Sequence, residues 1–430
     1  AAMATAEWSF VLMQGGALTI SNMLHKPDAV GRAFKNMWRA MGSEQRSANW
    51  LQRVKAQEWY PTAKEAKLAI TEPHGEATAR EELFFSDWTK MIWNALGSPL
   101  LLVNKAAHQR WALANPFRAI ERGSVAYLDT LRVERFLDGM AMLERNKAAG
   151  KEVTKQDYRD VADTINTLTG RASLGVAEPI AKGLTKVFFS PRLWASSIKT
   201  ATPYALYHFG KMTPTARKMA IQDMGRFVGT TMAFVAAAAL HFNNDDDDET
   251  GVETDPRSSD FGKIKIGNTR IDPWGGRMPQ LVFSARLIAR IVGMDAYKSN
   301  KGQVMPLGVR GKSPTLFDAA LDMAMNKLNP AASFVTDWAR AEERKDGKLY
   351  TKYGQEYDMS DEAIERLTPI YFGSVNDLMK EDPGALEGFL LFYAFFGGGV
   401  QIYEPKKKGT KSGSSSSAES LLKDLQDAKK

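Results

Sequence analysis

The sequence predicts a mainly α-helical protein with one small β-hairpin, at about Lys263–Asp272. Two observations predict this fold class. Apolar residues recur at helical spacing through most of the 430 residues, and one short stretch instead alternates apolar and charged residues around a two-residue turn. With 44% hydrophobic and 25% charged residues, the chain has the composition of a folded protein with a core, not of a disordered or multi-span membrane protein.

The hairpin prediction depends on Gly267-Asn268, a pair that accepts the positive φ angles of a two-residue turn. Pairing across this turn sets Ile264 opposite Ile271, Lys265 opposite Arg270 and Ile266 opposite Thr269. The three isoleucines then share one face of the hairpin and the charges share the other. Asp272-Pro273-Trp274-Gly275-Gly276 ends the second strand, because proline cannot continue the ladder and the glycines permit a sharp turn. Such a hairpin can also be a local structure without any chemistry.

Most of the remaining chain has helical periodicity. Residues 7–70 are mostly helical with a break at Gly15-Gly16, and Phe34, Met37, Trp38 and Met41 form an apolar stripe. Long helices are predicted over 116–148 and 214–241. Thr154, with Asp157 three residues later, predicts the start of another helix.

The segment Asn243–Asp260 is polar and acidic, and it is predicted to be an exposed loop. Beyond the hairpin, helices are predicted at 278–292, 315–328, 331–344, 360–367 and 374–380, before a last apolar segment at 384–403. A lysine run and a serine-rich stretch then predict a flexible tail. These changes divide the chain into regions 1–150, 151–242, 243–292, 293–404 and 405–430.

Charge and cysteine content exclude some classes of site. The formal charge of +7 and the pI of about 9.2 permit contact with nucleic acid or anionic lipid and require neither. The chain has no cysteine, which excludes disulfides, thiolate zinc sites and cysteine nucleophiles. The first residues of the chain do not resemble a signal peptide, and the helical periodicity is already under way at the first residue. We therefore expect a processed piece or C-terminal portion of a longer protein.

No motif for catalysis or metal binding emerges from the sequence. None of the five histidines forms an H-E-x-x-H pair, and neither a P-loop nor a G-x-S-x-G elbow is present. The acidic run from Asp245 invites a calcium loop, but a loop that starts at Asp246 places Arg257 where a bidentate glutamate is needed. A solvated acidic loop is therefore favoured. We assign no catalytic, cofactor-binding or metal-binding residue, expect no cofactor, and expect no enzymatic activity.

Three uncharged apolar windows, Met91–Asn104, Phe227–Leu240 and Gly388–Tyr403, bear on membrane contact. Helices of roughly 14–16 residues span about 21–24 Å, less than a hydrocarbon core of about 30 Å. Burial in the protein core is therefore favoured, and marginal insertion with help from partner helices is the alternative. In that alternative the membrane-contacting residues are Phe227, Phe234, Leu240, Phe389, Phe392 and Phe396.

Aromatic residues lie next to basic residues at three places, Lys35/Trp38/Arg39, Arg110/Trp111 and Arg192/Trp194. This pairing is compatible with stacking on a nucleic acid single strand or with interfacial lipid. Tryptophans in a helical protein are more often packing residues, so packing is the favoured interpretation.

Segments across Gln14–Leu287 carry a resemblance to a known family. They are Gln14–Ile20, Asp163–Asn166, Thr169–Arg171, Phe188–Ser196 and Thr254–Gly276. The motif residues within the last two are Phe189, Ser190, Pro191, Arg192, Asp260, Phe261, Gly262, Lys263, Gly267, Asn268, Asp272, Pro273, Trp274, Gly275 and Gly276. In the same order, these segments resemble the C-terminal module of bacteriophage large polyvalent and internal virion proteins, which are ejected with the genome.

The resemblance implies a virion protein carried inside the capsid or tail and found in the host cell envelope after ejection. It implies a structural, non-catalytic portion that oligomerises and helps form a trans-envelope conduit for DNA delivery. The implied partners are other copies of the chain, portal, neck or other ejection proteins, the host membrane and non-specific DNA. The alternative is a docking module of a larger packaged protein with a co-injected antirestriction or other cargo function. Helices reform quickly from local contacts, which suits a protein that refolds after ejection.

Overall fold

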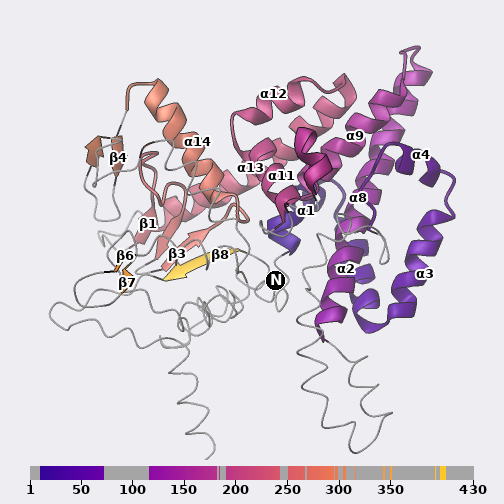
Figure 1. Ribbon diagram of the computed structural model, residues 1–430, viewed down its shortest axis with the longest axis horizontal. Helices are drawn as coiled ribbons and strands as arrows, with labels where there is room; N and C mark the ends of the chain where they lie inside the picture. Colours follow the sequence, from indigo (N-terminus) through magenta and orange to yellow (C-terminus); the bar gives the residue numbers. More distant parts are fainter. Residues whose placement is uncertain are drawn as a thin grey trace, which may run out of the picture.

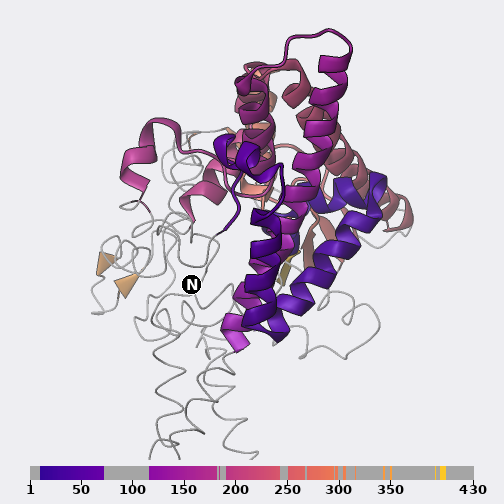
Figure 2. The ribbon, with the colours of Figure 1, turned by 90° about the vertical axis from the view of Figure 1, so that its right-hand side faces the viewer.

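The long helix α8 (Pro116–Ala148) is the element on which the helical part of the chain is assembled (Figure 1). In the computed structural model, α2 (Pro27–Gly42) packs along α8, and Figure 2 shows the N-terminal helices beside it. α9 (Lys155–Leu168) and α13 (Pro214–Phe242) also pack against α8, and α1 (Gly16–His25) lies against α13. Both long helices, α8 and α13, begin and end within one residue of their predicted positions.

The structure describes residues 10–71, 116–181, 184, 190–242, 250–266, 269–294, 296–298, 304–306, 315, 342–343, 349–350, 393 and 398–402. Its shorter helical elements are η2 (Phe10–Gln14), α3 (Glu44–Lys55), α4 (Tyr60–Glu65), η4 (Gly175–Ile180), α11 (Pro191–Ala201), α12 (Tyr204–Gly210) and α14 (Met278–Ile291). The predicted helices at 360–367 and 374–380, most of those at 315–328 and 331–344, and the 405–430 tail lie outside the described residues.

One hydrophobic core joins the helices. Its largest fully buried apolar side chains include Leu18, Met37, Leu128, Leu131, Phe136, Ile165 and Met219, each less than 2% exposed. The same cluster extends to Trp274 and Met278, so residues from the first three predicted regions share it. Of the predicted apolar stripe, Met37 is fully buried, but Trp38 is 56% exposed and does not belong to the core.

Two polar features stabilise the core helices. As predicted, Thr154 is the N-cap of α9, and its backbone N–H donates to the Asp157 carboxylate at 2.9 Å. Asp223 of α13 is fully buried, and it accepts hydrogen bonds from Arg135 Nε of α8 at 2.8 Å and from Ser21 Oγ of α1 at 2.6 Å. Satisfied on both oxygens, the buried carboxylate joins three helices at one point.

The predicted hairpin is confirmed as β2 (Ile264–Ile266) and β3 (Thr269–Asp272). Ile264 pairs with Ile271, Lys265 with Arg270 and Ile266 with Thr269, as the sequence predicts. Ile264 and Ile271 are buried, and Ile266 packs against them, so the isoleucines share one face. The turn residues Gly267 and Asn268 lie outside the described residues.

The hairpin is the centre of a larger sheet, which the sequence did not predict. β1 (Thr250–Val252) pairs with β2, and β8 (Gly399–Ile402) pairs with β3, giving the antiparallel order β1-β2-β3-β8. Figure 1 places this sheet below α14. The expectation that 388–403 forms one helix is therefore wrong at its end, because Val400 packs on the apolar face of the hairpin.

Two other expectations are corrected. Glu342–Glu343 (β6), inside a predicted helix, pairs with Leu349–Tyr350 (β7), and a further two-stranded sheet joins Ala296–Lys298 (β4) to Val304–Pro306 (β5). The acidic segment 243–260 is not simply an exposed loop, since it contributes β1 and buries Ser258. Asp255 accepts a hydrogen bond from Arg257 Nη2 at 2.8 Å, so part of the acidic charge is neutralised within the segment.

Candidate functional site

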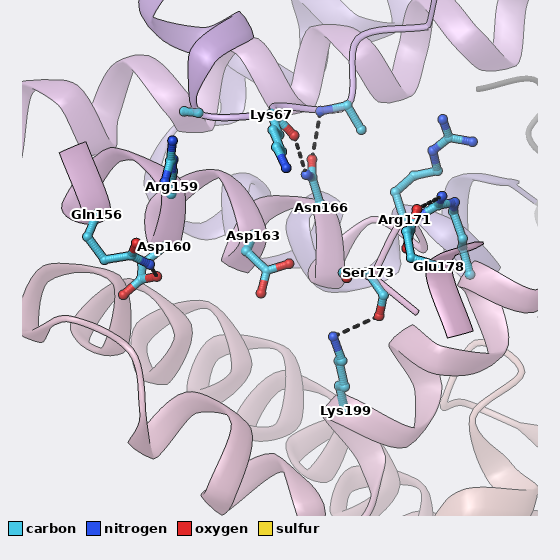
Figure 3. Close-up of a pocket in the computed structure, with 13 residues that line it drawn as sticks. Lys67, Gln156, Arg159, Asp160, Asp163, Asn166, Arg171, Ser173, Glu178 and Lys199 are labelled. Atoms are coloured by element: carbon cyan, nitrogen blue, oxygen red, sulfur yellow. Dashed lines mark hydrogen bonds and ion pairs between the residues drawn. The ribbon is translucent and has the colours of Figure 1, made fainter. Parts of the chain in front are cut away.

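A charged pocket of about 630 Å³ lies between the turn after α4, helix α9, helix α11 and the segment 171–178 (Figure 3). Its lining residues include both acidic and basic side chains, and most of them lie on helices. They are Ala66, Lys67, Ala69, Gln156, Arg159, Asp160, Asp163, Asn166, Arg171, Ser173, Glu178, Arg192 and Lys199. Asp163, Asn166, Arg171 and Arg192 come from three of the segments that carry the family resemblance.

Asn166 of α9 holds one wall of the pocket in place. Its Oδ1 accepts the Ala69 backbone N–H at 2.9 Å, and its Nδ2 donates to the Lys67 carbonyl at 2.9 Å (Figure 3). Arg132 of α8 donates from Nη1 to the Ala69 carbonyl at 3.1 Å. These bonds keep Lys67 in the left-handed backbone region, with φ of 62°, where a non-glycine residue is strained.

A second strained residue, Ser190, lies close to the lining residue Arg192. Ser190 has φ of 47° and precedes α11, which begins at Pro191. Arg192 then forms an ion pair with Glu178, whose carboxylate also accepts the Leu174 backbone N–H at 3.0 Å. In the described part of the chain, Lys67 and Ser190 are the two non-glycine residues with positive φ. Lys67 lines this pocket, and Ser190 lies two residues before the lining residue Arg192. Retained backbone strain of this kind is concentrated at functional sites.

Some pocket charges are compensated and others are not. Asp160 accepts the Thr213 backbone N–H at 2.7 Å and a hydrogen bond from Gln156 at 2.6 Å. Burial raises the pKa of Asp163, although the Lys199 charge opposes this shift. Burial also lowers the pKa of Lys199, which donates to the Ser173 carbonyl at 2.9 Å. Asp163 and Lys199 are thus two polar groups with spare hydrogen-bonding capacity that face the same space.

His208 of α12 lies behind Asp163. Its Nε2 is 3.7 Å from Asp163 Oδ2 and makes no hydrogen bond. Burial, followed by the Lys199 charge, lowers the pKa of His208 to about 4. The neutral ring stacks on Tyr204, with the ring centroids 6.4 Å apart. Chemically, the pocket can accept a polar group that bridges Asp163 and Lys199.

Sequence reasoning found this pocket only in part. The segments that carry the family resemblance contain Asp163, Asn166, Arg171 and Arg192, but the sequence assigns no role to these residues. It missed Lys67, Lys199 and His208, because these come from separate elements and no local spacing marks them. Phe189 lies outside the described residues.

The hairpin motif lies apart from the charged pocket and is held together by its own hydrogen bonds and ion pair. Asp260 and Lys263 are joined by an ion pair of 2.7 Å. Trp274 Nε1 donates to the Gly262 carbonyl at 3.3 Å, and the Trp274 backbone N–H donates to Asp272 at 2.8 Å. Burial raises the pKa of the Asp272 carboxyl to about 6. Each of these residues is thereby fixed against another part of the same motif.

The motif segments meet at η2 and the start of α1. A Cβ on Gly275 would lie 2.6 Å from the Leu12 carbonyl oxygen, and one on Gly276 would lie 3.1 Å from Met13 Cε. On the other side, a Cβ on Gly170 would lie 3.5 Å from Gln14 Cβ. Segments separated by more than one hundred residues in the sequence are therefore in close contact.

Helix α13 exposes several large apolar side chains in its C-terminal half, on more than one side of the helix. Its exposed large side chains there are Val228, Met232, Phe234 and Leu240, of which Phe234 is 44% and Leu240 is 73% exposed. Phe227, also predicted to contact lipid, is instead buried against Trp274, with ring centroids 6.5 Å apart. Phe389, Phe392 and Phe396 lie outside the described residues. None of the helices in the described part is long and apolar enough to cross a bilayer.

Within the same described ranges, no group of three or more histidine, aspartate or glutamate side chains could hold a metal ion. Comparison with known proteins finds no matching family model, no matching curated protein and no matching solved structure.

Proposed function

We propose that this chain is the structural, non-catalytic portion of a phage internal virion protein. In this proposal it is ejected with the genome and helps form a trans-envelope conduit for DNA delivery. Its partners are other copies of itself and other virion proteins, and its places of action are the virion interior and then the host cell envelope.

The observation that carries the proposal is the set of exposed apolar side chains on α13. Between Phe227 and Leu240 the helix has no formal charge, and Val228, Met232, Phe234 and Leu240 are exposed on it. Large apolar side chains that are exposed on an uncharged helix segment favour contact with lipid or with a neighbouring subunit. Alanines at 236–239 would let another helix approach closely.

A second observation supports membership in the phage module. The segments that carry the resemblance are distant in sequence, but a Cβ on Gly170 would lie 3.0 Å from Leu193 Cδ1 and 3.5 Å from Gln14 Cβ. Three of these segments therefore pack against one another, as is expected of residues that occur together as a motif set.

The alternative function is a docking module for a larger packaged virion protein with an antirestriction or other cargo function. The charged pocket beside α9 favours it, because the strained Lys67 and polar groups with spare hydrogen-bonding capacity, Asp163 and Lys199, suit recognition of a partner segment. Both functions are compatible with the absence of assigned catalytic residues.

Flotation with liposomes distinguishes the two. The purified chain would be mixed with vesicles of phosphatidylethanolamine and phosphatidylglycerol, and its mass would be measured in buffer and in lipid. The conduit proposal predicts co-flotation with a shift to a defined oligomer. A monomer that stays at the bottom of the gradient would contradict the conduit and favour docking to the particle.

A further inference from the structure

A second cavity, of about 770 Å³, lies between α2 and α3 on the N-terminal side of the protein. Its lining differs from that of the pocket beside α9, because the described residues that form it include three arginines, a tryptophan and several amides, and none of them is a carboxylate. The lining residues are Asn36, Arg39, Ala40, Arg46, Ser47, Asn49, Trp50, Gln52, Arg53 and Ala56. We refer to this cavity as the arginine groove.

Helix α3 presents its basic and aromatic residues in one row. Arg46, Trp50 and Arg53 follow i, i+4, i+7 spacing, so they lie on the same helix face over about 10 Å. Ser43 fixes the start of the helix by accepting the Arg46 backbone N–H at 3.4 Å. Arg39 of α2 completes the lining from the other side.

The arginines of the groove are uncommitted. In the part of the chain that the structure describes, the side chains of Arg39 and Arg46 form no hydrogen bond or ion pair, and Arg53 donates only to the Asn49 carbonyl of its own helix, at 3.3 Å. Arg32 of α2, by contrast, binds Glu134 of α8 at 2.6 Å. Arg32 thus forms an ion pair that joins two helices, whereas the guanidinium N–H groups of the groove arginines can donate to a ligand.

This set of groups matches one ligand chemistry. Free guanidinium groups bind phosphate oxygens in bidentate fashion, and a tryptophan ring offers a plane on which a nucleobase stacks. Gln52 supplies an amide donor and acceptor for the edge of an unstacked base. A duplex would use only the arginines, since its bases are stacked on one another. An acidic peptide would likewise leave Trp50 without a role.

We propose that the arginine groove binds single-stranded nucleic acid, with phosphates on Arg39, Arg46 and Arg53 and a base stacked on Trp50. The inference does not depend on the envelope role of α13, because it uses no residue of that helix. The ring plane and the arginine row together predict binding that is tolerant of sequence and strongly dependent on salt.

Fluorescence anisotropy with a labelled twenty-residue oligothymidylate tests this proposal on the full chain. We expect saturable binding that weakens as salt rises from 50 to 200 mM, and at least a tenfold loss of affinity in Arg46→Gln/Arg53→Gln. Trp50→Phe should retain most of the affinity and Trp50→Leu should lose it. Arg145→Gln is the matched control, because Arg145 is exposed on α8 and its side chain donates to the Ala141 carbonyl of its own helix at 3.0 Å.

Three results would overturn the proposal. The first is no binding at 50 mM salt by a chain whose thermal unfolding is normal. The second is an equal loss of affinity in the control variant and the groove variants. The third is tighter binding of a duplex of the same length with no effect of Trp50→Leu, which would indicate phosphate attraction alone. Liposome flotation of the groove variants should be unchanged. Loss of nucleic-acid binding with normal flotation would show that the groove and the conduit proposal are tested independently.

Discussion

Gly275 lies so close to Leu12 that a Cβ atom at position 275 would be 2.6 Å from the Leu12 carbonyl oxygen. The contact joins the segment after the hairpin to the segment before α1, and Gly275 has φ of +60°. Both the space and the backbone conformation therefore require glycine.

Gly275→Ala is expected to destabilise the protein by about 3 kcal/mol or more, since a steric clash adds to the cost of a left-handed alanine. Chemical denaturation measures this loss. Gly150→Ala is the control, because Gly150 has φ of +75° but nothing within 4 Å of its Cβ position. Its cost should be about 1 kcal/mol. Equal losses in the two variants would show that the contact with Leu12 is unimportant.

The buried carboxylate of Asp223 should be one of the most sensitive positions in the core. Asp223→Ala leaves Arg135 buried without its partner, which is expected to lower the free energy of unfolding by about 3–5 kcal/mol. Urea unfolding tests the prediction. Glu65→Ala removes a pair with Lys155 that is exposed on both sides, and the unfolding midpoint should stay the same. A small effect at Asp223 would contradict the junction described for α1, α8 and α13.

Asn166→Ala should loosen the wall of the charged pocket. The change removes the acceptor for the Ala69 N–H and the donor for the Lys67 carbonyl, with an expected loss of about 2–3 kcal/mol. Hydrogen exchange of the Ala69 amide should also accelerate. In Asn49→Ala, which removes an exposed bond to Gln45, exchange at Ala69 should be unchanged.

His208 should make the protein sensitive to mild acid. Its pKa is lowered from 6.5 to about 4, so the folded state favours the neutral ring. The resulting contribution to stability is fully present above pH 6.5 and is lost as pH falls toward 4, at most about 3 kcal/mol. Asp272 acts in the opposite direction, because its raised pKa of about 6 means that its protonation favours the folded state as pH falls.

The contribution of His208 is therefore the difference in the free energy of unfolding between the wild type and His208→Phe. Urea unfolding measures this difference at a series of pH values from 7 to 4. The stability advantage of the wild-type chain should shrink across this range. A constant difference would show that His208 does not titrate as described.

Phe227 and Phe234 are seven residues apart on α13 but have opposite environments. Phe227→Ala should cost about 3–4 kcal/mol, because Phe227 is 3% exposed and packs against Trp274. Phe234→Ser should leave thermal stability nearly unchanged, since Phe234 is 44% exposed. Calorimetry of the two variants distinguishes these effects, and a large loss in Phe234→Ser would show that this side chain is needed by the fold.

The parts of the fold that the sequence predicted depend on local signals. α8 and α13 have long apolar periodicities, α9 has a capping pair at Thr154 and Asp157, and the hairpin has its turn dipeptide. β8 was missed because its partner, β3, lies more than one hundred residues earlier in the chain, and no local pattern encodes that pairing.

The candidate sites were predictable to a similar degree. Motif residues such as Asn166 and Arg192 were noticed, but their meeting with Lys67 and Lys199 depends on helix packing. The basic-aromatic pairing of Trp38 and Arg39 was also noticed. The arginine groove uses Arg39 with Trp50 of the next helix, and Trp38 is not part of its lining.

The central claim is that the exposed apolar side chains of α13 contact lipid or other copies of the chain in the envelope. The natural chain has no cysteine, so single cysteines can be introduced at Phe234, at Leu240 and, as a control, at exposed Lys151. Each variant would carry an environment-sensitive dye and be added to vesicles while its mass is recorded. The account predicts a blue shift at positions 234 and 240, none at 151, and an oligomer. Unchanged emission at 234 and 240, or the same shift at all three positions, would contradict it.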